Sequence, residues 1–311
     1  MLNLQKEEIS VKGQPVLVDS VRVDTKIIII TGKFLKIARI KDEWYEDVEE
    51  PEAMIKALKS IRPTPDIFTF WQRLPETEPK YNYFMEVDNV AAIPIKGYEY
   101  WYEKQIDINA RRAIKKAEKK GVVVKKAEFN DKFIQGMTEI FNETPIRQGK
   151  PFWHYGKNFE TVKREFSRYL YREDLIGAYY NNELIGFMFL AYAGKYVLPG
   201  QIISKIAHRD KAPNNALIAK AVEICEKKKI LYFVYFYWGD GSLAEFKRRN
   251  GFEKITLPRY YIPLTIKGKI ILKLNLHHSA LGIIPEKLKV RLKNMRKQFY
   301  TRRYLTQSDK Y

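Results

Sequence analysis

The second half of the chain alternates between continuous apolar runs and amphipathic stretches. The apolar runs are rich in Ile, Val, Phe and Tyr, which is typical of buried strands. The amphipathic stretches repeat their apolar positions every three or four residues, as helices packed on a core do. The pattern predicts a strand at 122–129, helices at 131–144 and 158–171, strands at 174–181, 183–193 and 196–208, a helix at 214–229, a strand at 231–238, a helix at 242–250 and a strand at 252–264.

The first 121 residues show the same mixture in a less regular order. An uninterrupted apolar run at 27–30 indicates a strand that is covered on both faces. Residues 107–121 give the clearest helix, with an Ala/Ile stripe on one side, Arg and Lys on the others, and Gly121 as its stop. The other predicted elements are strands at 16–23, 26–40 and 66–70, two short strands within 81–94, a helix ending near residue 61 and an aromatic helix at 98–105.

Composition places the chain among folded proteins with a substantial core. The 311 residues are 45% apolar and 14% aromatic, which excludes wholesale disorder and allows two domains or one with an appendage. Cys225 is the only cysteine and lies in an apolar helix pattern, so we expect a buried thiol and no internal disulfide. The four histidines lack the spacing of metal ligands, and no metal is expected. Because no apolar run suits a signal peptide or a membrane span, we expect a cytoplasmic protein without an integral membrane segment.

The net charge of +19 is concentrated toward the C-terminus. Residues 1–100 hold 14 Lys and Arg against 17 Asp and Glu, residues 101–265 hold 30 against 18, and residues 266–311 hold 12 against 2. Such a basic tail predicts a polyanionic partner, either tRNA or an anionic membrane surface, or else a solvated extension. The segments 266–276 and 288–304 mix apolar and basic residues, so peripheral attachment to a membrane stays open.

Two segments resemble the GNAT superfamily of acyltransferases. The element order from 122 to 264, with its strand, polar loop and helix at 203–229, resembles the GNAT fold. The residues YEYW at 98–101, followed by RRAIKKAEKKGV, are similar to a stretch of the Fem-type (FemAB-like) branch, where it lies between two GNAT-like halves. The resemblance implies an α/β (α+β) fold: a GNAT-like mixed sheet flanked by helices, preceded by a smaller, degenerate GNAT-like N-terminal domain. The implied parts are an N-terminal α/β domain ending in a basic helix (1–121), an acyltransferase domain (122–265) and a basic C-terminal extension (266–311).

A site for a phosphorylated donor is predicted in the loop at 206–215. Arg209 and Lys211 precede a helix whose N-terminal N–H groups attract anions, and Asn214 or Asn215 can cap that helix. In GNAT proteins this loop holds the pyrophosphate of acyl-coenzyme A with the help of glycines, whereas residues 209–216 contain none. The resemblance implies acetyl-CoA or another acyl-CoA as donor, held by Arg209, Lys211, Asn214, Asn215 and Lys247 at its phosphates and by the backbone of Ile206 and Ala207 along its pantetheine arm.

The general acid has candidates in two neighbouring elements. GNAT enzymes usually place a Tyr there, and the corresponding motif FKRRNGF at 246–252 has Lys247 at that position. A Lys near other cations can have a lowered pKa and protonate a leaving group. Tyr235 and Tyr237, which share one face of the preceding strand, are the alternatives, and Tyr237 is the candidate catalytic residue.

Residues 142–157, NETPIRQGKPFWHYGK, form the densest polar and aromatic cluster outside a regular element. In the GNAT layout this loop covers the acceptor cleft. Glu143 and His154 are the candidate bases for the acceptor amine. The candidate substrate contacts are Arg147, Tyr155 and Lys157, with Gln201 on the acyl carbonyl. The alternative is that the cluster only packs the loop against the rest of the protein.

Three functions stay open. The first is an N-acyltransferase that moves an acyl group from acyl-CoA to an amine. The second is a Fem-type aminoacyl-tRNA-dependent transferase acting on a cell-envelope precursor, and the third is a non-catalytic GNAT-fold protein that binds nucleic acid. Fem proteins that grip tRNA often carry a long helical hairpin, which the sequence lacks, whereas dispersed Lys and Arg suit a phosphate backbone. The acceptor is not indicated.

Overall fold

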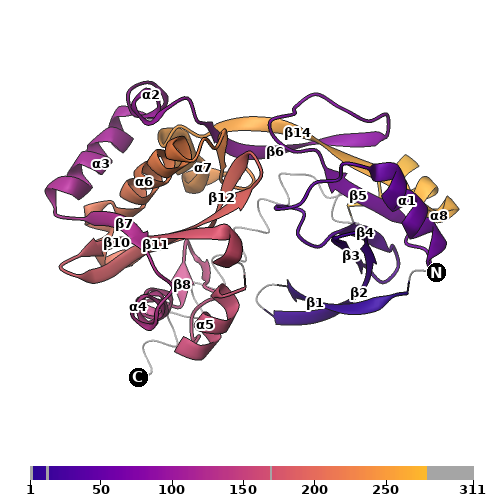
Figure 1. Ribbon diagram of the computed structural model, residues 1–311, viewed down its shortest axis with the longest axis horizontal. Helices are drawn as coiled ribbons and strands as arrows, with labels where there is room; N and C mark the ends of the chain where they lie inside the picture. The colour runs from indigo at the N-terminus through magenta and orange to yellow at the C-terminus, as the bar shows by residue number, and fades with distance from the viewer. Residues whose placement is uncertain (1–2, 12–13, 169, 279–311) are drawn as a thin grey trace.

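The computed structural model describes residues 3–11, 14–168 and 170–278, so the predicted amphipathic stretch at 288–304 lies outside these ranges. One 12-stranded sheet runs through the molecule in the order β1-β2-β3-β4-β5-β14-β6-β13-β12-β11-β10-β7. Figure 1 shows two curved halves joined by the long strands β6 (Phe84–Pro94) and β14 (Glu253–Pro263). No helix in the described ranges is long and apolar enough to cross a membrane.

The first half of the chain builds one end of this sheet. Strands β1 to β4 are antiparallel neighbours, and β5 returns parallel to β4 after helix α1. Helix α1 begins at Pro51, whose fixed φ suits a first helical turn, and it buries Met54, Ile55 and Leu58. The elements are β1 (Gln5–Val11), β2 (Gln14–Val23), β3 (Lys26–Thr31), β4 (Ile37–Ile40), α1 (Pro51–Ser60) and β5 (Ile67–Trp71).

A helical connection carries the chain from β6 to the second half. It consists of α2 (Tyr98–Tyr100), a π-helical turn η1 (Trp101–Gln105) and α3 (Ile108–Lys119). Asp107 caps α3 by accepting a 2.8 Å hydrogen bond from the Ala110 amide. Trp101 is fully buried, and its indole Nε1 donates to the carbonyl of Asn250 at 3.0 Å. The connection is therefore fixed to the second half rather than loosely tethered to it.

The second half repeats the topology of the first. Strands β7, β10, β11 and β12 are antiparallel neighbours, and β13 returns parallel to β12 after helix α6. The elements are β7 (Val123–Ala127), α4 (Asp131–Asn142), β8 (Ile146–Arg147), β9 (Lys150–Pro151), α5 (Phe159–Phe166), η2 (Leu170–Arg172), β10 (Glu173–Tyr180), β11 (Glu183–Ala193), β12 (Tyr196–Ser204), η3 (Ile206–Lys211), α6 (Pro213–Lys227), β13 (Tyr232–Val234), α7 (Gly241–Arg249) and, after β14, α8 (Ile266–Lys273).

The two halves exchange their last strands. Strand β6 ends the first half but pairs with β13 of the second, whereas β14 ends the second half but pairs with β5 of the first. The two exchanged strands pair with each other at the centre of the sheet. The sheet order is therefore symmetric about this central pair, which confirms the predicted mixed sheet with a GNAT-like N-terminal part.

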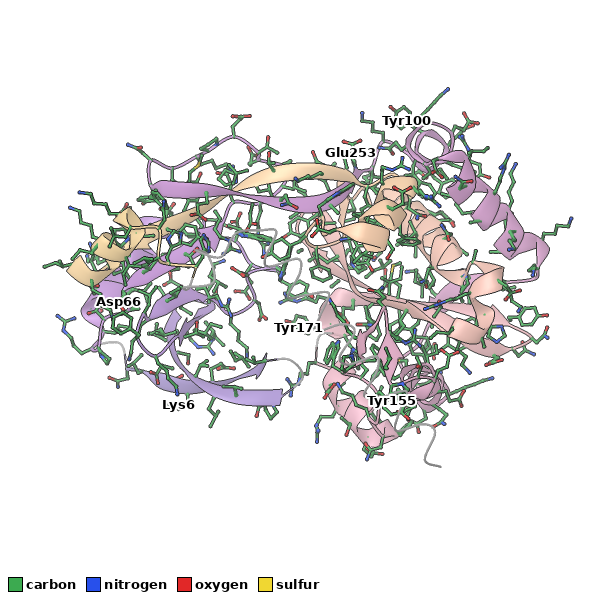
Figure 2. All side chains as sticks on the ribbon, turned by 180° about the vertical axis from the view of Figure 1, so that it is seen from behind. Lys6, Asp66, Tyr100, Tyr155, Tyr171 and Glu253 are labelled. Atoms are coloured by element: carbon green, nitrogen blue, oxygen red, sulfur yellow. The ribbon has the colours of Figure 1, made fainter. Side chains whose placement is uncertain are left out.

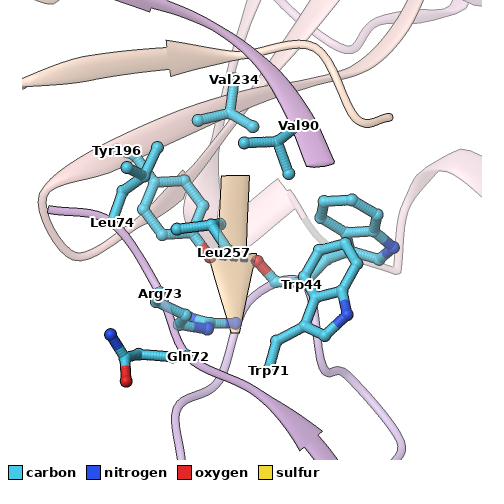
Figure 3. A pocket seen from close by; sticks show the side chains of 9 residues that line it. All are labelled: Trp44, Trp71, Gln72, Arg73, Leu74, Val90, Tyr196, Val234 and Leu257. Carbon is cyan, nitrogen blue, oxygen red and sulfur yellow. Dashed lines mark hydrogen bonds between the residues drawn. The ribbon is translucent and has the colours of Figure 1, made fainter. Parts of the chain in front are cut away.

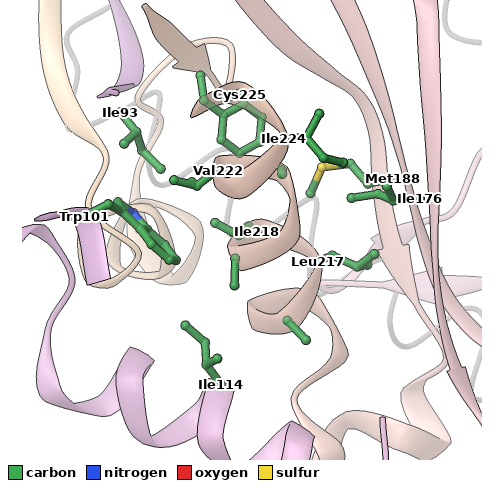
Figure 4. Packing of buried hydrophobic residues seen from close by; sticks show 14 of the residues in the cluster. Ile93, Trp101, Ile114, Ile176, Met188, Leu217, Ile218, Val222, Ile224 and Cys225 are labelled. Carbon is green, nitrogen blue, oxygen red and sulfur yellow. The ribbon is translucent and has the colours of Figure 1, made fainter. Parts of the chain in front are cut away.

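Helix α6 is the most deeply buried helix near the predicted site. Figure 4 shows it between the sheet and α3, with Ile218 facing Ile114 and Leu217 facing Ile176. Cys225 lies in this core, which confirms the predicted buried thiol, and burial raises the pKa of this thiol to about 12. A rigid α6 fixes the position of the loop that precedes it.

Some predicted elements have different extents in the structure. The strand expected at 196–208 ends at Ser204, where the chain turns into the short 3-10 helix η3. The strand expected at 231–238 pairs regularly only over Tyr232–Val234, because the next residues leave β12 and Phe236 adopts a left-handed φ of 46°. The segment 81–94 holds one long strand, β6, instead of two. Its length follows from the central pairing with β14, which no local pattern reveals.

Candidate functional site

Strands β12 and β13 separate after a short parallel contact. Only Tyr196↔Tyr232 and Val197↔Phe233 pair between them in the described residues. Beyond this point the chain after β13 stays on β6, because Tyr235 donates to the Ala91 carbonyl at 2.7 Å and Ala91 donates back to Phe236 at 2.8 Å. The two strands are thus parallel over a short contact and then separate along one edge of β12. This separation is called the gap below.

Lys247 stabilises the far side of this gap. Where the chain leaves β12, the carbonyls of Tyr235 and Tyr237 no longer face a strand. The Lys247 ammonium donates to both, at 2.8 Å for Tyr235, while its side chain is almost fully buried. Burial lowers the pKa of Lys247 to about 8, although hydrogen bonds to carbonyls favour the charged form. The predicted phosphate contact is thus a cation already engaged by the backbone.

A β-bulge in β12 lies on the opposite side of the gap. Phe189 pairs with Gln201 and Leu190 with Pro199, so Gly200 is an extra residue without a partner. The bulge interrupts the ladder between β11 and β12 three residues after Val197, where β12 and β13 make their last paired contact. A β-carbon at Gly200 would lie 3.3 Å from a carboxylate oxygen of Glu173, so the acid lies beside the bulge.

Glu173 is a functional candidate that the sequence analysis missed. It begins β10 and lies on the same face of the sheet as Leu175 and the helices α4 and α5. Burial raises the pKa of Glu173 to about 7, and the nearby charge of Arg172 opposes the shift. A carboxylate with this pKa suits general-base catalysis near neutral pH. The available signal was an acidic pair, Glu173 and Asp174, placed directly before a buried strand.

Glu143 and Arg147 lie against the loop at 206–215, the predicted donor site, which is called the donor loop below. The Glu143 carboxylate accepts hydrogen bonds from the amides of Ile206 at 2.6 Å and Ala207 at 2.9 Å. Arg147 binds Glu143 at 3.0 Å and donates to the Ser204 carbonyl at 2.9 Å. The two backbone amides predicted to serve a donor are therefore bound to an internal carboxylate. Glu143 acts here as an acceptor for the loop and is held away from the role of a free base.

The rest of the donor loop differs from the expected anion cradle. Helix α6 begins at Pro213, which has no N–H, and its N-cap is Ala212 in a left-handed conformation. The expectation that Asn214 or Asn215 caps the helix is wrong: Asn215 hydrogen-bonds Asn250 at 2.9 Å, because the residues sit inside the first turn. Lys211 contacts Asp210 at 3.2 Å and lies over the Tyr180 ring. Arg209 remains exposed and is close enough to Arg147 to lower the pKa of that guanidinium, after burial itself.

His154 lies in an aromatic core. Its ring stacks on Phe141 with a centroid distance of 4.2 Å, and the residue is 1% exposed. Burial, followed by the charge of Lys157, lowers the pKa of His154 to about 3, while Gln201 favours the protonated form. A base this weak removes protons poorly at neutral pH, so the geometry favours a packing role for His154.

A pH-dependent stability test follows from this burial. The imidazole of His154 has its ordinary pKa near 6.5 in the unfolded chain, whereas its pKa is about 3 in the folded chain. The free energy of unfolding should therefore fall by up to about 1.4 kcal/mol for each pH unit below 6.5. Urea unfolding of wild type and His154→Phe at pH 7, 6 and 5 measures this term, with His208→Phe as a control. Equal pH slopes in wild type and His154→Phe would contradict the assignment.

The remaining predicted residues lie in three different places: Lys157 beside the His154 core, Tyr155 at the surface and Tyr237 at a second cleft. Lys157 pairs with Glu165 and lies 3.3 Å from Nδ1 of His154, whereas Tyr155 is exposed at the surface of the second half (Figure 2). Tyr237 points away from the gap and lines a cleft of about 550 Å³ together with Arg259 and residues of β3 to β6. None of the other predicted site residues lines this cleft.

An aromatic layer between the halves is too tightly packed to be a site. Figure 3 shows Trp44, Trp71, Tyr196 and Leu257 around a cavity of only about 10 Å³, with the Tyr196 hydroxyl donating to the Trp44 carbonyl at 2.8 Å. A cavity of this size holds at most a water molecule. The layer therefore joins the two halves and leaves no room for a ligand between them. Larger clefts lie beside Tyr237, at about 550 Å³, and between α4 and the turn that joins β10 to β11, at about 380 Å³.

A basic helix face flanks the donor loop. Helix α3 exposes Arg112, Lys115, Lys116 and Lys119 on one side while its Ala/Ile stripe packs on α6. The next residue, Lys120, pairs with Asp210 of η3 at 2.7 Å, which places the C-terminal end of α3 beside the loop. A polyanion bound along α3 would therefore end near the gap.

Comparisons with solved structures agree with this architecture. No protein-family profile matches the sequence, and no curated protein matches it. FemX matches with 11% identity over 88% of this chain and 90% of its own, at a TM-score of 0.54. L-PGS from Bacillus licheniformis matches with 13% identity over 81% and 85%, and a protein described as the C-terminal domain of a lysylphosphatidylglycerol synthetase from Agrobacterium fabrum with 11% over 83% and 88%, both at 0.54. Identities this low establish the fold alone. The chain thus has the tandem GNAT fold that it shares with FemX and L-PGS.

Proposed function

We propose that the protein transfers an acyl group from an activated donor to an amine, with the donor lying in the gap between β12 and β13. The observation that carries the proposal is the separation of these strands after Val197↔Phe233, directly beside the bulge at Gly200. The bulge supplies unpaired backbone groups for a thioester or ester carbonyl. Holding donor and acceptor in attack geometry is worth roughly 7–11 kcal/mol in such reactions, so the site needs few catalytic groups.

Two side chains have the properties that the reaction requires. Glu173, with a pKa raised to about 7, takes the proton of the amine as its nitrogen attacks the carbonyl carbon. Lys247, with a pKa lowered to about 8, stabilises negative charge at the gap and returns a proton to the leaving atom as the bond to the acyl carbon breaks. One proton is taken and one is returned, so the transfer is balanced without a further reactant.

The donor that we favour is an aminoacyl-tRNA. Glu143 binds the amides of Ile206 and Ala207, and Pro213 removes an N–H from the start of α6, so little of a pyrophosphate cradle is left. The exposed cations of α3 instead suit a phosphate backbone. An alkoxide leaving group also needs a proton donor more than a thiolate does, because alcohols are far weaker acids than thiols.

Acyl-CoA is the second candidate because of Arg209. Its side chain is exposed on the donor loop, where a guanidinium can bind a phosphate through two parallel hydrogen bonds. In this case the donor loop itself holds the phosphates, and Arg209→Ala should weaken acyl-CoA binding by about 1–3 kcal/mol.

A binding experiment with paired variants separates the donors. We expect Lys116→Glu/Lys119→Glu on α3 to weaken tRNA binding about tenfold and to reduce its salt dependence. Fluorescence anisotropy with charged tRNA, uncharged tRNA and acetyl-CoA at several salt concentrations measures both. Lys56→Glu/Lys59→Glu on α1 is the matched control, with the same change in net charge far from the gap. Binding of acetyl-CoA alone, lost in Arg209→Ala, would support the second candidate instead.

The proposed class of acceptor rests on the name of a structural neighbour. One neighbour is described as a lysylphosphatidylglycerol synthetase, a name that states transfer of a lysyl group to a phospholipid. We propose that the acceptor is similarly attached to a lipid or a cell-envelope precursor, which fits the basic C-terminal segment. The test is to incubate the purified protein with radiolabelled aminoacyl-tRNA and either lipid vesicles or amine-bearing peptides. Label in the lipid fraction would identify a lipid acceptor, and label in the peptide fraction would identify a peptide acceptor.

A further inference from the structure

Three side chains from distant parts of the chain meet beside the second cleft. Glu86 lies on β6, and His277 and His278 follow helix α8. Nε2 of His277 lies 2.9 Å from one carboxylate oxygen of Glu86, and Nε2 of His278 contacts the other oxygen. The partners are 191 and 192 residues apart, so no spacing rule applied to the sequence could pair them.

The two histidines and the carboxylate form one compact cluster. Two consecutive histidines turn their rings toward the same carboxylate, with ring centroids 4.1 Å apart. The His277 side chain is fully buried, that of Glu86 is 34% exposed and that of His278 is 50% exposed. Tyr261 closes one side of the cluster at a centroid distance of 4.6 Å from His277. Both histidines also line the 550 Å³ cleft.

The ligand set matches the preferences of a borderline divalent metal. One atom from each residue can be chosen so that the three lie within 4.8 Å of one another. A tetrahedral ion with bonds of about 2.0–2.1 Å keeps its ligands about 3.3 Å apart, so small side-chain movements would fit the ion. Two imidazoles and one carboxylate suit Zn²⁺ far better than Mg²⁺ or Ca²⁺, which prefer oxygen ligands.

We propose that Glu86, His277 and His278 form a binding site for a divalent transition metal ion of the Zn²⁺ class, with its remaining position open to the cleft. The site is independent of the proposed acyl transfer, since none of its residues lies at the gap. Bound metal would tie the segment after α8 to the central strand β6. It would also bring a cationic centre to a cleft that already holds Tyr237 and Arg259.

Metal titration of the full-length, tag-free protein tests the site. After dialysis against a chelator, calorimetry with Zn²⁺ alone should show one site per chain, and Co²⁺ should give the visible spectrum of a four- or five-coordinate ion. Zn²⁺ should raise the melting temperature, since it binds only the folded chain, and Mg²⁺ should not. His278→Ala and Glu86→Gln should each weaken Zn²⁺ binding by about 10–100-fold or more.

The variants are chosen so that folding does not confuse the result. His278 is half exposed, and Glu86→Gln keeps the size and a hydrogen-bond acceptor, so both should fold; His277→Ala removes a buried ring and is avoided. His208→Ala, in η3, is the control and should bind Zn²⁺ like wild type. Wild-type protein that binds no Zn²⁺ overturns the proposal, and so does binding that survives both substitutions, because the ion would then lie elsewhere.

Discussion

Glu173→Gln should lower the turnover of acyl transfer by about 10²–10⁴-fold, the usual contribution of a general base. Glutamine keeps the size of the side chain beside the Gly200 bulge but cannot take a proton. Because Glu173 has a pKa of about 7 in the folded chain and an ordinary one, near 4.5, in the unfolded chain, its burial destabilises the wild type progressively as the pH rises from about 4.5 to 7. The variant should therefore be more stable than the wild type at neutral pH and above, and the difference should shrink toward pH 4.5. Turnover and urea unfolding on the same preparations measure both effects.

The pH dependence of kcat/KM gives a second test of Glu173 as the general base. Because Glu173 must be ionised to act, kcat/KM of the wild type should rise with pH and level off above a midpoint near 7. Asp174→Asn is the matched control: Asp174 lies on the opposite face and binds the Tyr192 hydroxyl at 2.6 Å, so its loss should affect stability and leave turnover normal. A Glu173→Gln enzyme with wild-type turnover would exclude the base role.

Lys247→Met should be the most destabilising of the proposed substitutions. Methionine fills the same volume but leaves the carbonyls of Tyr235 and Tyr237 buried without a donor, which we expect to cost about 2–5 kcal/mol. In protein that still folds at low temperature, turnover should also fall by about 10²–10³-fold, the effect of removing one group that stabilises the developing charge. Thermal unfolding and turnover at 10–15 °C below the lowered melting temperature are the measurements.

Substitution of a nearby exposed cation, Arg249, is the control for the loss of positive charge alone. Arg249 lies two residues further along α7, is 47% exposed in its side chain, and pairs with Glu245 at the surface. Arg249→Met should change stability by less than about 1 kcal/mol. If Lys247→Met were no more destabilising than Arg249→Met, the ammonium would not be needed to hold the strand after β13.

The sequence predicted the order of elements in the second half because each element carries its own periodicity. Helix α6 and strands β10 to β12 follow the apolar pattern closely. The end of β13 could not be predicted in this way, since its aromatics continue the strand pattern to Trp238. The strand ends earlier because the chain after Val234 stays on β6, with which β13 already pairs, while Lys247 takes the place of β12 as the partner of its backbone.

The site was harder to predict than the fold, since its chemistry depends on contacts between distant residues. Glu143 looks like a free base in the sequence, but two amides 63 and 64 residues away bind its carboxylate. His154 lies in a polar loop of the sequence, which suggested a catalytic base, but in the structure its ring is buried against Phe141. Glu173 gave only a weak signal, because its raised pKa follows from burial beside the Gly200 bulge.

The exchange of β6 and β14 determines how this protein responds to truncation. Removing the chain from residue 253 onward would take away the strand between β5 and β6, so a deletion at the C-terminus would damage the N-terminal half. The exposed edges of β5 and β6 would then be available to pair with other chains, which is the usual route to aggregation. Neither half can therefore be lost or replaced alone during evolution without a compensating strand, and the two are expected to have been inherited as one unit.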